Sequence, residues 1–373
     1  MSNDAIIPVV MPKWGLSMRE GTVNEWLVDE GSEITPGMAI LNVETDKIAN
    51  AVEATDAGIL RRKVAEAGDV LPVKALLGVL APPHIGDAEI EAFIADWAPL
   101  TDSDEESEDE QAATAWVEVN GLRIRYASRG EGEGTVLFIH GFGGDLDNWL
   151  FNLDALAERY HVVALDLPGH GQSSTRLPGA QLGDLADFTA DFMDAISLPA
   201  AHVIGHSLGG AIASELALRQ PDRVRSLALI DSAGFGPEVN HRYTEGFINA
   251  QSRRELKPVV ELLFADPALV SRQMLDDLLK YKRLDGVDNA LAALQNNLFA
   301  EGRQSAQPGL QLSDADIPLL LIWGEEDRII PVEHAEQAPA HARVETLSGA
   351  GHMPQMEKAA EVNQLLLKHL GAV

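Results

Sequence analysis

One serine lies in a sequence pattern that nucleophilic enzymes use. Ser207 is the centre of a Gly-x-Ser-x-Gly stretch at 205–209, between a short apolar run and a helix-compatible run that begins at Ala211. A sharp strand-to-helix turn presents the serine hydroxyl, and small neighbours let adjacent backbone pass close to it. The same turn aims the Leu208 N–H and the helix N-terminus at a developing oxyanion. The pattern therefore predicts a serine nucleophile, with Leu208 as a backbone donor.

Two later side chains follow in the order that a serine triad can take. Asp327 and His352 each come just after an apolar, strand-like run, so the chain order is Ser, Asp, His. A serine hydroxyl is a poor nucleophile at neutral pH until an imidazole takes its proton, and a buried carboxylate orients that imidazole. The sequence therefore predicts a triad of Ser207, His352 and Asp327. Asp231, which ends the strand-like run 224–230, is an alternative acid.

A glycine-rich turn at 140–144 follows another strand-like run. Its Phe142 N–H is placed to join that of Leu208 as the second donor to an oxyanion. The His, Asp and Glu residues nowhere show the sequence spacing of a metal site. We interpret the other polar residues near these loops as structural or solvated: His140, Asp166, His206, Glu325 and Glu326.

Strands and helices alternate over residues 116–373, and they must position these loops. Buried strand runs that alternate with helices indicate a mostly parallel sheet covered on both faces. The alternation is interrupted over about 236–312, where charged and apolar residues mix at helical spacing, and we interpret this segment as an inserted helical cap. The whole region resembles the α/β-hydrolase fold.

The first eighty residues have a different pattern. Short β-rich runs alternate with glycine turns, which predicts a small all-β domain over residues 1–82. Gly21 recurs 37 residues later as Gly58, a faint repeat that predicts two similar half-sheets. Lys47 separates two of the strand-like runs, so we expect it at a hairpin tip.

Two segments carry a family resemblance. Residues 11–23 (MPKWGLSMREGTV) and 44–47 (ETDK) closely resemble the lipoyl domain of 2-oxo acid dehydrogenase-type complexes. The resemblance implies a flattened β-barrel, with a lipoyl group that a lipoate ligase attaches to Lys47 as an amide. Biotinyl domains share this fold, but methionines flank their lysine, and none flanks Lys47. Lys74 departs from the family, which has glycine there.

Residues 83–115 read as a linker. Residues 87–98 have a helical spacing of apolar residues, and 101–110 hold seven acidic residues among ten with no base. Such a run predicts a disordered, self-repelling spacer. A coil of roughly 20 residues spans on the order of 25 Å, enough for a tethered domain to visit another surface.

Composition limits the partners and the compartment. The 373 residues carry a formal charge of −30, which makes nucleic acid an improbable partner. Cysteine is absent, which suits a reducing compartment. The sequence shows no signal peptide and no apolar run of about 18 residues. We therefore expect a cytoplasmic protein with no membrane association.

The fusion of a lipoyl domain with an α/β-hydrolase domain resembles the dihydrolipoamide acetyltransferase (E2) components of acetoin dehydrogenase complexes. The resemblance implies transfer of an acetyl group from dihydrolipoyl-lysine to coenzyme A. It also implies a thiamine-diphosphate-dependent E1 partner and a dihydrolipoamide dehydrogenase (E3) partner. We expect the chain to be a homo-oligomer. The His-x-x-x-Asp-Gly signature of the ordinary acyltransferase core is absent from the sequence.

Other functions remain open at the level of sequence. The hydrolase half is also similar to esterases and C–C bond hydrolases, so acetyl transfer rests mainly on the fusion. The alternative is an esterase, a thioesterase or a C–C bond hydrolase that carries a lipoyl tether. A carrier whose hydrolase-like domain only binds partners is a third possibility. Within acyl transfer, Ser207 attacks the thioester, or His352 instead deprotonates an incoming thiol directly. The effect of replacing Ser207 discriminates among these alternatives.

Overall fold

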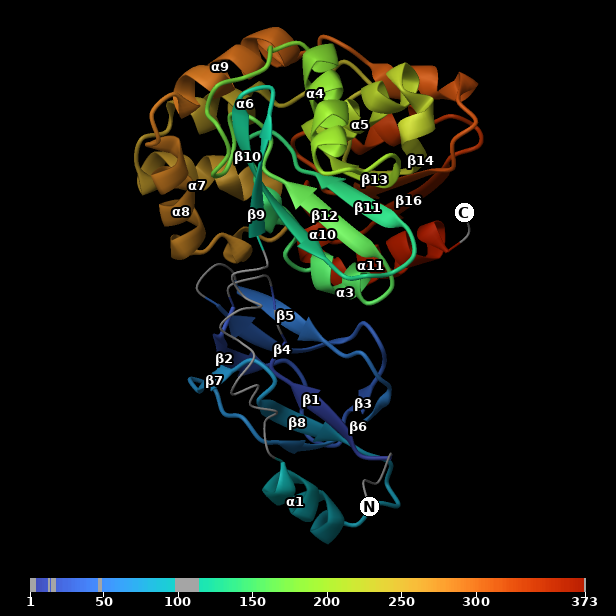
Figure 1. Cartoon of the computed structure of the whole chain (residues 1–373). Coiled ribbons are helices and arrows are strands. Elements are labelled where there is room, and N and C mark those ends of the chain that lie inside the picture. Colours follow the sequence, from blue (N-terminus) through green and yellow to red (C-terminus); the bar gives the residue numbers. More distant parts are fainter. Residues whose placement is uncertain (1–4, 13, 15–17, 46–48, 98–113, 372–373) are drawn as a thin grey trace. The chain divides into compact units, whose positions relative to one another are not determined.

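The computed structural model describes residues 5–12, 14, 18–45, 49–97 and 114–371 (Figure 1). The chain divides into two compact units, Met1–Gln111 and Ala112–Val373, and each is described by itself. In the described ranges, no helix is both long and apolar enough to cross a lipid bilayer.

The first unit is a pair of four-stranded sheets, ordered β1-β8-β6-β3 and β5-β4-β2-β7. Apolar side chains of both sheets form one core, in which the Trp26 indole donates to the Ala65 carbonyl at 2.9 Å. Gly78 lies against this indole, where an added Cβ would come within 2.8 Å of the ring. The strands are β1 (Ile7–Val10), β2 (Glu20–Trp26), β3 (Glu33–Ile34), β4 (Ala39–Glu44), β5 (Ala49–Glu53), β6 (Gly58–Lys63), β7 (Val70–Pro72) and β8 (Leu76–Leu80).

Lys47 lies outside the described residues, but the strands on either side of it are described. Strands β4 and β5 pair antiparallel, and their last pair before the connection is Glu44 with Ala49. Glu44 is exposed. The two strands therefore form a hairpin whose end faces solvent, and the segment that contains Lys47 connects them.

Helix α1 (Asp87–Asp96) packs on the first unit. Ile90 is fully buried against the sheet, and Arg61 binds the Asp87 carboxylate at 2.8 Å. Arg62 binds the Glu91 carboxylate at 2.7 Å. We expected this helix within a flexible linker; the structure instead holds it by apolar burial that includes Leu76 and Val79 of β8, and by two arginines of β6. The acidic run 101–110 lies outside the described residues.

The second unit is built on one eight-stranded sheet, ordered β16-β15-β14-β13-β11-β12-β10-β9. Strands β11 to β16 are parallel, and the β9–β10 hairpin adds antiparallel to β12. The strands are β9 (Thr114–Val119), β10 (Leu122–Arg129), β11 (Thr135–Ile139), β12 (His161–Leu165), β13 (Ala201–His206), β14 (Val224–Ile230), β15 (Leu319–Gly324) and β16 (Arg343–Leu347). The predicted parallel sheet is confirmed.

Helices cover both faces of this sheet, as Figure 1 shows. Helices α4 (Leu182–Ala195) and α5 (Leu208–Arg219) lie on one face, and α3 (Leu153–Ala157), α10 (Pro354–Glu357) and α11 (Ala359–Leu370) lie on the other. Between β14 and β15 the chain forms four helices that gather on one side of the sheet: α6 (His241–Asn249), α7 (Arg253–Val260), α8 (Arg272–Lys282) and α9 (Val287–Leu298).

Candidate active site

Ser207 lies at the turn between β13 and α5. Its backbone has φ 53° and ψ −119°, a strained conformation for a residue with a side chain. Glycines on either side make the turn possible. A Cβ at Gly205 would lie 2.4 Å from the Gly209 carbonyl, and one at Gly209 would lie 2.1 Å from the Ile139 carbonyl. The strained backbone conformation of Ser207 is thus maintained by close backbone packing at the two neighbouring glycines.

Asp327 and His352 meet at the same edge of the sheet. Asp327 follows β15 and His352 follows β16, and Nδ1 of the imidazole lies 2.8 Å from Oδ2 of the carboxylate. The side chains are 0% and 2% exposed. The other carboxylate oxygen of Asp327 accepts from the N–H groups of Ile329 and Ile330, at 2.7 and 3.1 Å. Two backbone N–H groups and the imidazole thus hold this buried side chain in one orientation.

The loop that carries His352 is held on two sides. His206, the neighbour of Ser207, donates from Nε2 to the His352 carbonyl at 2.7 Å, and the two rings lie 4.8 Å apart. On the other side the His352 N–H donates to the Leu263 carbonyl at 2.8 Å. The first contact ties the histidine loop to the residue before Ser207, and the second ties it to the segment between β14 and β15.

Two glutamates support this loop in a way that sequence reasoning missed. Glu326, which we expected to be merely solvated, accepts from the N–H groups of Gly349 and Ala350. Glu357 accepts from Gly351 N–H and Ala265 N–H, both at 2.7 Å. Glu326 follows β15 as Asp327 does, but nothing in the sequence shows that the path of the distant histidine loop brings N–H groups to either glutamate.

Asp231, the alternative acid, lies in the same cluster. One side-chain oxygen or nitrogen each from Asp231, Asp327 and His352 lies within 4.8 Å of the others. Asp231 is fully buried, and one of its oxygens accepts from the Gly324 N–H at 3.0 Å. Of the two candidate acids, Asp327 is the one in hydrogen-bond contact with the imidazole.

The glycine-rich turn after β11 lies beside Ser207. An added Cβ at Gly141 would come within 2.9 Å of the Ser207 Cβ. Among the described residues, neither the Phe142 N–H nor the Leu208 N–H, at the first position of α5, has a hydrogen-bond acceptor. Two unpaired donors beside a serine are what an oxyanion site requires. The Phe142 carbonyl, in turn, accepts from the buried Tyr243 hydroxyl at 3.1 Å.

His140 and Asp166 brace the loops on this edge, as we expected. His140 Nε2 accepts from the Leu167 N–H at 3.0 Å, while Nδ1 donates to the Gly141 carbonyl at 2.8 Å. Asp166 accepts from the N–H groups of Leu146 and Gln172. The pKa of His140 is lowered well below its usual value by burial and by the neighbouring His170. A neutral imidazole is required for this pair of hydrogen bonds.

Buried neutral histidines make the second unit sensitive to acid. Burial lowers the pKa of His170 from 6.5 to about 4. Because the folded pKa is lowered, protonation favours the unfolded chain. This stability is complete above about pH 6.5 and is lost as the pH falls toward about 4. Near pH 5 the loss is about 2 kcal/mol for one such group.

We therefore expect His170→Gln to flatten the fall in unfolding free energy between about pH 7 and pH 5. Urea unfolding, followed by circular dichroism of the helices, measures this slope. His341 is exposed, so His341→Gln should leave the slope as in the parent protein. An unchanged slope in His170→Gln would contradict a neutral buried His170.

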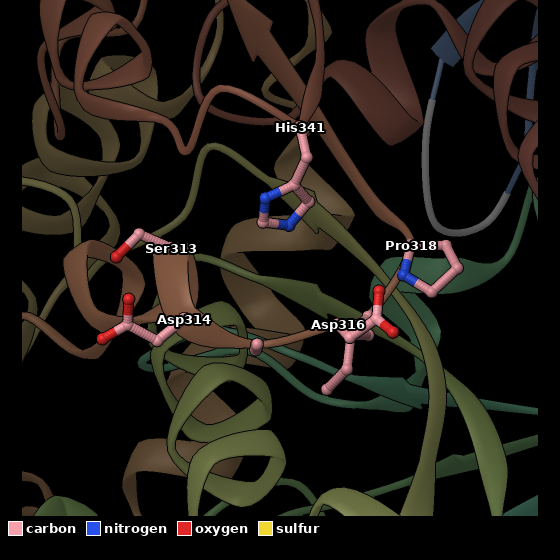
Figure 2. Close-up of a pocket in the computed structure, with 7 residues that line it drawn as sticks. Ser313, Asp314, Asp316, Pro318 and His341 are labelled. Atoms are coloured by element: carbon pink, nitrogen blue, oxygen red, sulfur yellow. The ribbon is translucent and has the colours of Figure 1, made fainter.

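A surface pocket of about 520 Å³ lies away from this site (Figure 2). Its lining residues directly precede β15 and β16, so they lie at the amino ends of those strands, at the edge opposite Ser207. They are Ser313, Asp314, Ala315, Asp316, Ile317, Pro318 and His341. In parallel sheets, ligands bind beyond the carboxyl ends of the strands. We therefore place the candidate active site at the Ser207 edge.

Comparisons with known proteins agree with the two-part organisation. The α/β hydrolase fold family matches residues 134–359. The biotin-requiring enzyme family, which includes lipoyl domains, matches residues 7–80. The chain is 65% identical, over 367 residues, to the dihydrolipoyllysine-residue acetyltransferase component of the acetoin cleaving system of Cupriavidus necator, and the match covers 98% of each chain. The chain belongs to this family.

A second member of the family comes from Pseudomonas putida. It is 45% identical over 364 residues, which cover 97% of this chain and 98% of that protein. Both relatives match across the lipoyl and the hydrolase parts together. The family resemblance drawn from the sequence is therefore confirmed.

Solved structures resemble the second unit. A meta-cleavage product hydrolase from Pseudomonas fluorescens has a TM-score of 0.64 and 22% identity, over 70% of this chain and 99% of that one. At this identity the likeness shows the fold alone. The predicted fold class, a lipoyl-type β domain followed by an α/β-hydrolase fold, is confirmed.

Proposed function

We propose that the chain is the acetyltransferase component of an acetoin-cleaving system, and that it transfers an acetyl group from a dihydrolipoyl thioester to coenzyme A. Full-length similarity to two such components supports the activity. The observation that supports the chemistry is the hydrogen bond between His352 and Asp327, at the sheet edge where Ser207 lies. A hydrolase riding on a tether is not favoured, because the family relatives match both parts of the chain.

The proposed reaction uses Ser207 as a relay. His352 takes the hydroxyl proton as Ser207 Oγ attacks the thioester carbonyl, and the Asp327 carboxylate stabilises the resulting imidazolium. The Phe142 and Leu208 N–H groups hold the oxyanion. The thiol leaves with the proton from His352, which gives acetyl-Ser207. The coenzyme A thiol then gives its proton to His352 and attacks this ester. The bond to Ser207 Oγ breaks and the oxygen takes the proton back from His352, which gives acetyl-CoA and the free serine.

The lysine hairpin fits a lipoyl group. Strands β4 and β5 pair up to Glu44 and Ala49, and Glu44 is exposed, so the described end of the hairpin is open to a ligase. The lipoyl group supplies the sulfur that carries the acetyl cargo. The hairpin's contribution is the hydrogen-bonded pair of strands that leads into and out of the attachment segment.

We also propose the partners that this chemistry needs. A thiamine-diphosphate-dependent E1 component would load the acetyl group, and a dihydrolipoamide dehydrogenase (E3) would reoxidise the dithiol. The chain itself would act as a homo-oligomer in the cytoplasm. Co-purification of the native chain, followed by its mass in solution, measures both the partners and the copy number.

The function is tested by the fate of the acetyl group. Purified chain receives S-acetyl-dihydrolipoamide with and without coenzyme A, and the acyl products are identified. We expect acetyl-CoA with coenzyme A present, and little free acetate without it. Equal turnover to acetate in both samples would identify a thioesterase and contradict acetyl transfer.

Tyr243 offers a prediction about the oxyanion loop. Its hydroxyl fixes the Phe142 carbonyl from helix α6, so Tyr243→Phe should let the Phe142 peptide shift. We expect kcat to fall about 10-fold with KM little changed, since a whole oxyanion donor is worth on the order of 100-fold or more. Initial rates of acetyl-CoA formation measure this.

The matched control is Tyr281→Phe. Tyr281 lies on α8, which is also between β14 and β15, and its hydroxyl donates a hydrogen bond to the Gly169 carbonyl at 2.7 Å. It should lose a comparable hydrogen bond without the same fall in kcat. An equal fall in both variants would mean that the hydroxyls act only through general stability.

A further inference from the structure

Asp231 is a buried acid that the proposed reaction does not use. It lies at the end of β14, with φ 42°, a backbone conformation that residues with side chains rarely adopt. Its side chain is 0% exposed. A strained residue with a buried carboxyl group, one strand from the proposed catalytic acid, calls for a specific role.

The two oxygens of Asp231 differ in their surroundings. Oδ1 accepts from the Gly324 N–H at 3.0 Å, while Oδ2 is fully buried and has no hydrogen-bond partner among the described residues. The acids and imidazole that face this carboxyl are Asp327, His352 and, further away, Glu357. An ionised oxygen without a donor would be costly here.

The surroundings and charges of the two carboxyl groups also favour a neutral Asp231. Asp327 has hydrogen-bond partners on both oxygens, namely two backbone N–H groups and His352, whereas Asp231 has one on a single oxygen. Burial raises the pKa of Asp231 well above its usual value, and the Asp327 charge raises that pKa further. Two carboxyl groups that share a buried site hold one proton between them.

We propose that Asp231 is a neutral carboxylic acid that positions Asp327, with the proton on Oδ2 directed toward the Asp327 carboxylate. Gly324 N–H holds Asp231 from the end of β15, and Asp231 in turn holds the loop that carries Asp327. The donated hydrogen bond draws charge away from Asp327. This keeps the ionised acid beside His352 in one orientation and limits how strongly it raises the basicity of the imidazole. The inference rests on the proposed triad.

Two variants separate this role from others. Asp231→Asn keeps an acceptor for the Gly324 N–H and a donor for Asp327, so kcat should stay within about 3-fold of the parent. Asp231→Leu keeps the branched shape and the number of side-chain heavy atoms but neither polar group, and should lower kcat about 30-fold with KM little changed. Without the donor, Asp327 holds the imidazolium more tightly, so the acid limb of kcat/KM should move to higher pH.

The pH profile is measured on the first turnover of a simple acetyl ester, which acetylates Ser207 and releases the alcohol without coenzyme A. Infrared difference spectra of the full chain at neutral pH provide a readout independent of activity. The carbonyl band of a protonated carboxylic acid should be lost in Asp231→Asn and retained in Asp327→Asn. If acetyl transfer itself is absent, the proposed function fails while this band still decides the state of Asp231.

Three results would overturn the proposal. The first is a loss of activity in Asp231→Asn as large as that in Asp327→Asn, which would make Asp231 the ionised acid. The second is an unshifted acid limb in Asp231→Leu, which would leave Asp231 a purely structural role. The third is an infrared band that does not change in Asp231→Asn.

Discussion

Replacing Ser207 with alanine is expected to lower acetyl-CoA formation from S-acetyl-dihydrolipoamide by on the order of 10⁴-fold or more. The substitution removes the only atom that can carry the acetyl group in the proposed relay. The turn itself should survive, because its tight packing comes from Gly205 and Gly209 rather than from the serine hydroxyl. Single-turnover rates with saturating coenzyme A measure the loss.

Ser214 provides the matched control for this variant. It lies in the same helix, is fully buried, and donates its hydroxyl to the Gly210 carbonyl at 2.9 Å. Ser214→Ala should therefore keep its activity within about 3-fold. Acetyl-CoA formation that survives in Ser207→Ala would mean that His352 activates the thiol directly, without an acetyl-serine.

Replacing Lys47 with arginine should abolish lipoylation and, with it, acetoin-dependent turnover in the assembled system. A guanidinium stays protonated and cannot form the amide that a lysine amine forms. Transfer from free S-acetyl-dihydrolipoamide should be unchanged, because the residues proposed for that step lie in the second unit. Intact mass of chain from its native host, together with the two activity assays, measures both expectations.

Lys63 is the control in the same unit. It pairs with the Asp29 carboxylate at 3.1 Å at the end of β6, and arginine can keep that contact. Lys63→Arg should therefore be lipoylated and should support acetoin-dependent turnover. A lipoyl group still present on Lys47→Arg would place the attachment site at another lysine.

Much of the site could be predicted because parallel strands place their carboxyl ends at one edge. Ser207, Asp327 and His352 each follow a strand-like run in the sequence, so one rule gathers them. In the structure, the Asp327 carboxyl group is in hydrogen-bond contact with the His352 imidazole. The catalytic roles of the three residues are proposals. The all-β character of the first unit was also readable from its glycine turns, although β3 and β7, with two and three residues, are too short to show an alternating pattern.

Contacts between segments that are distant in the chain could not be predicted from the sequence. Helix α1 has a helical period, but its docking depends on Arg61 and Arg62, whose partners no local pattern specifies. Glu357 likewise accepts hydrogen bonds from the Gly351 and Ala265 N–H groups only because the fold brings these loops together. From the sequence, Asp231 and Asp327 were alternative candidates for the acid of the triad. The structure shows that both lie in one cluster with His352.

The central claim is that Ser207 carries the acetyl group between two thiols. The most direct measurement is to mix the chain with S-acetyl-dihydrolipoamide without coenzyme A, quench the mixture rapidly, and map acetylation by peptide mass spectrometry. We expect one acetyl group on the peptide that contains Ser207, and its disappearance with matching acetyl-CoA when coenzyme A is added. Acetyl-CoA formed at the full rate with no acetyl-Ser207 at any time would contradict the claim.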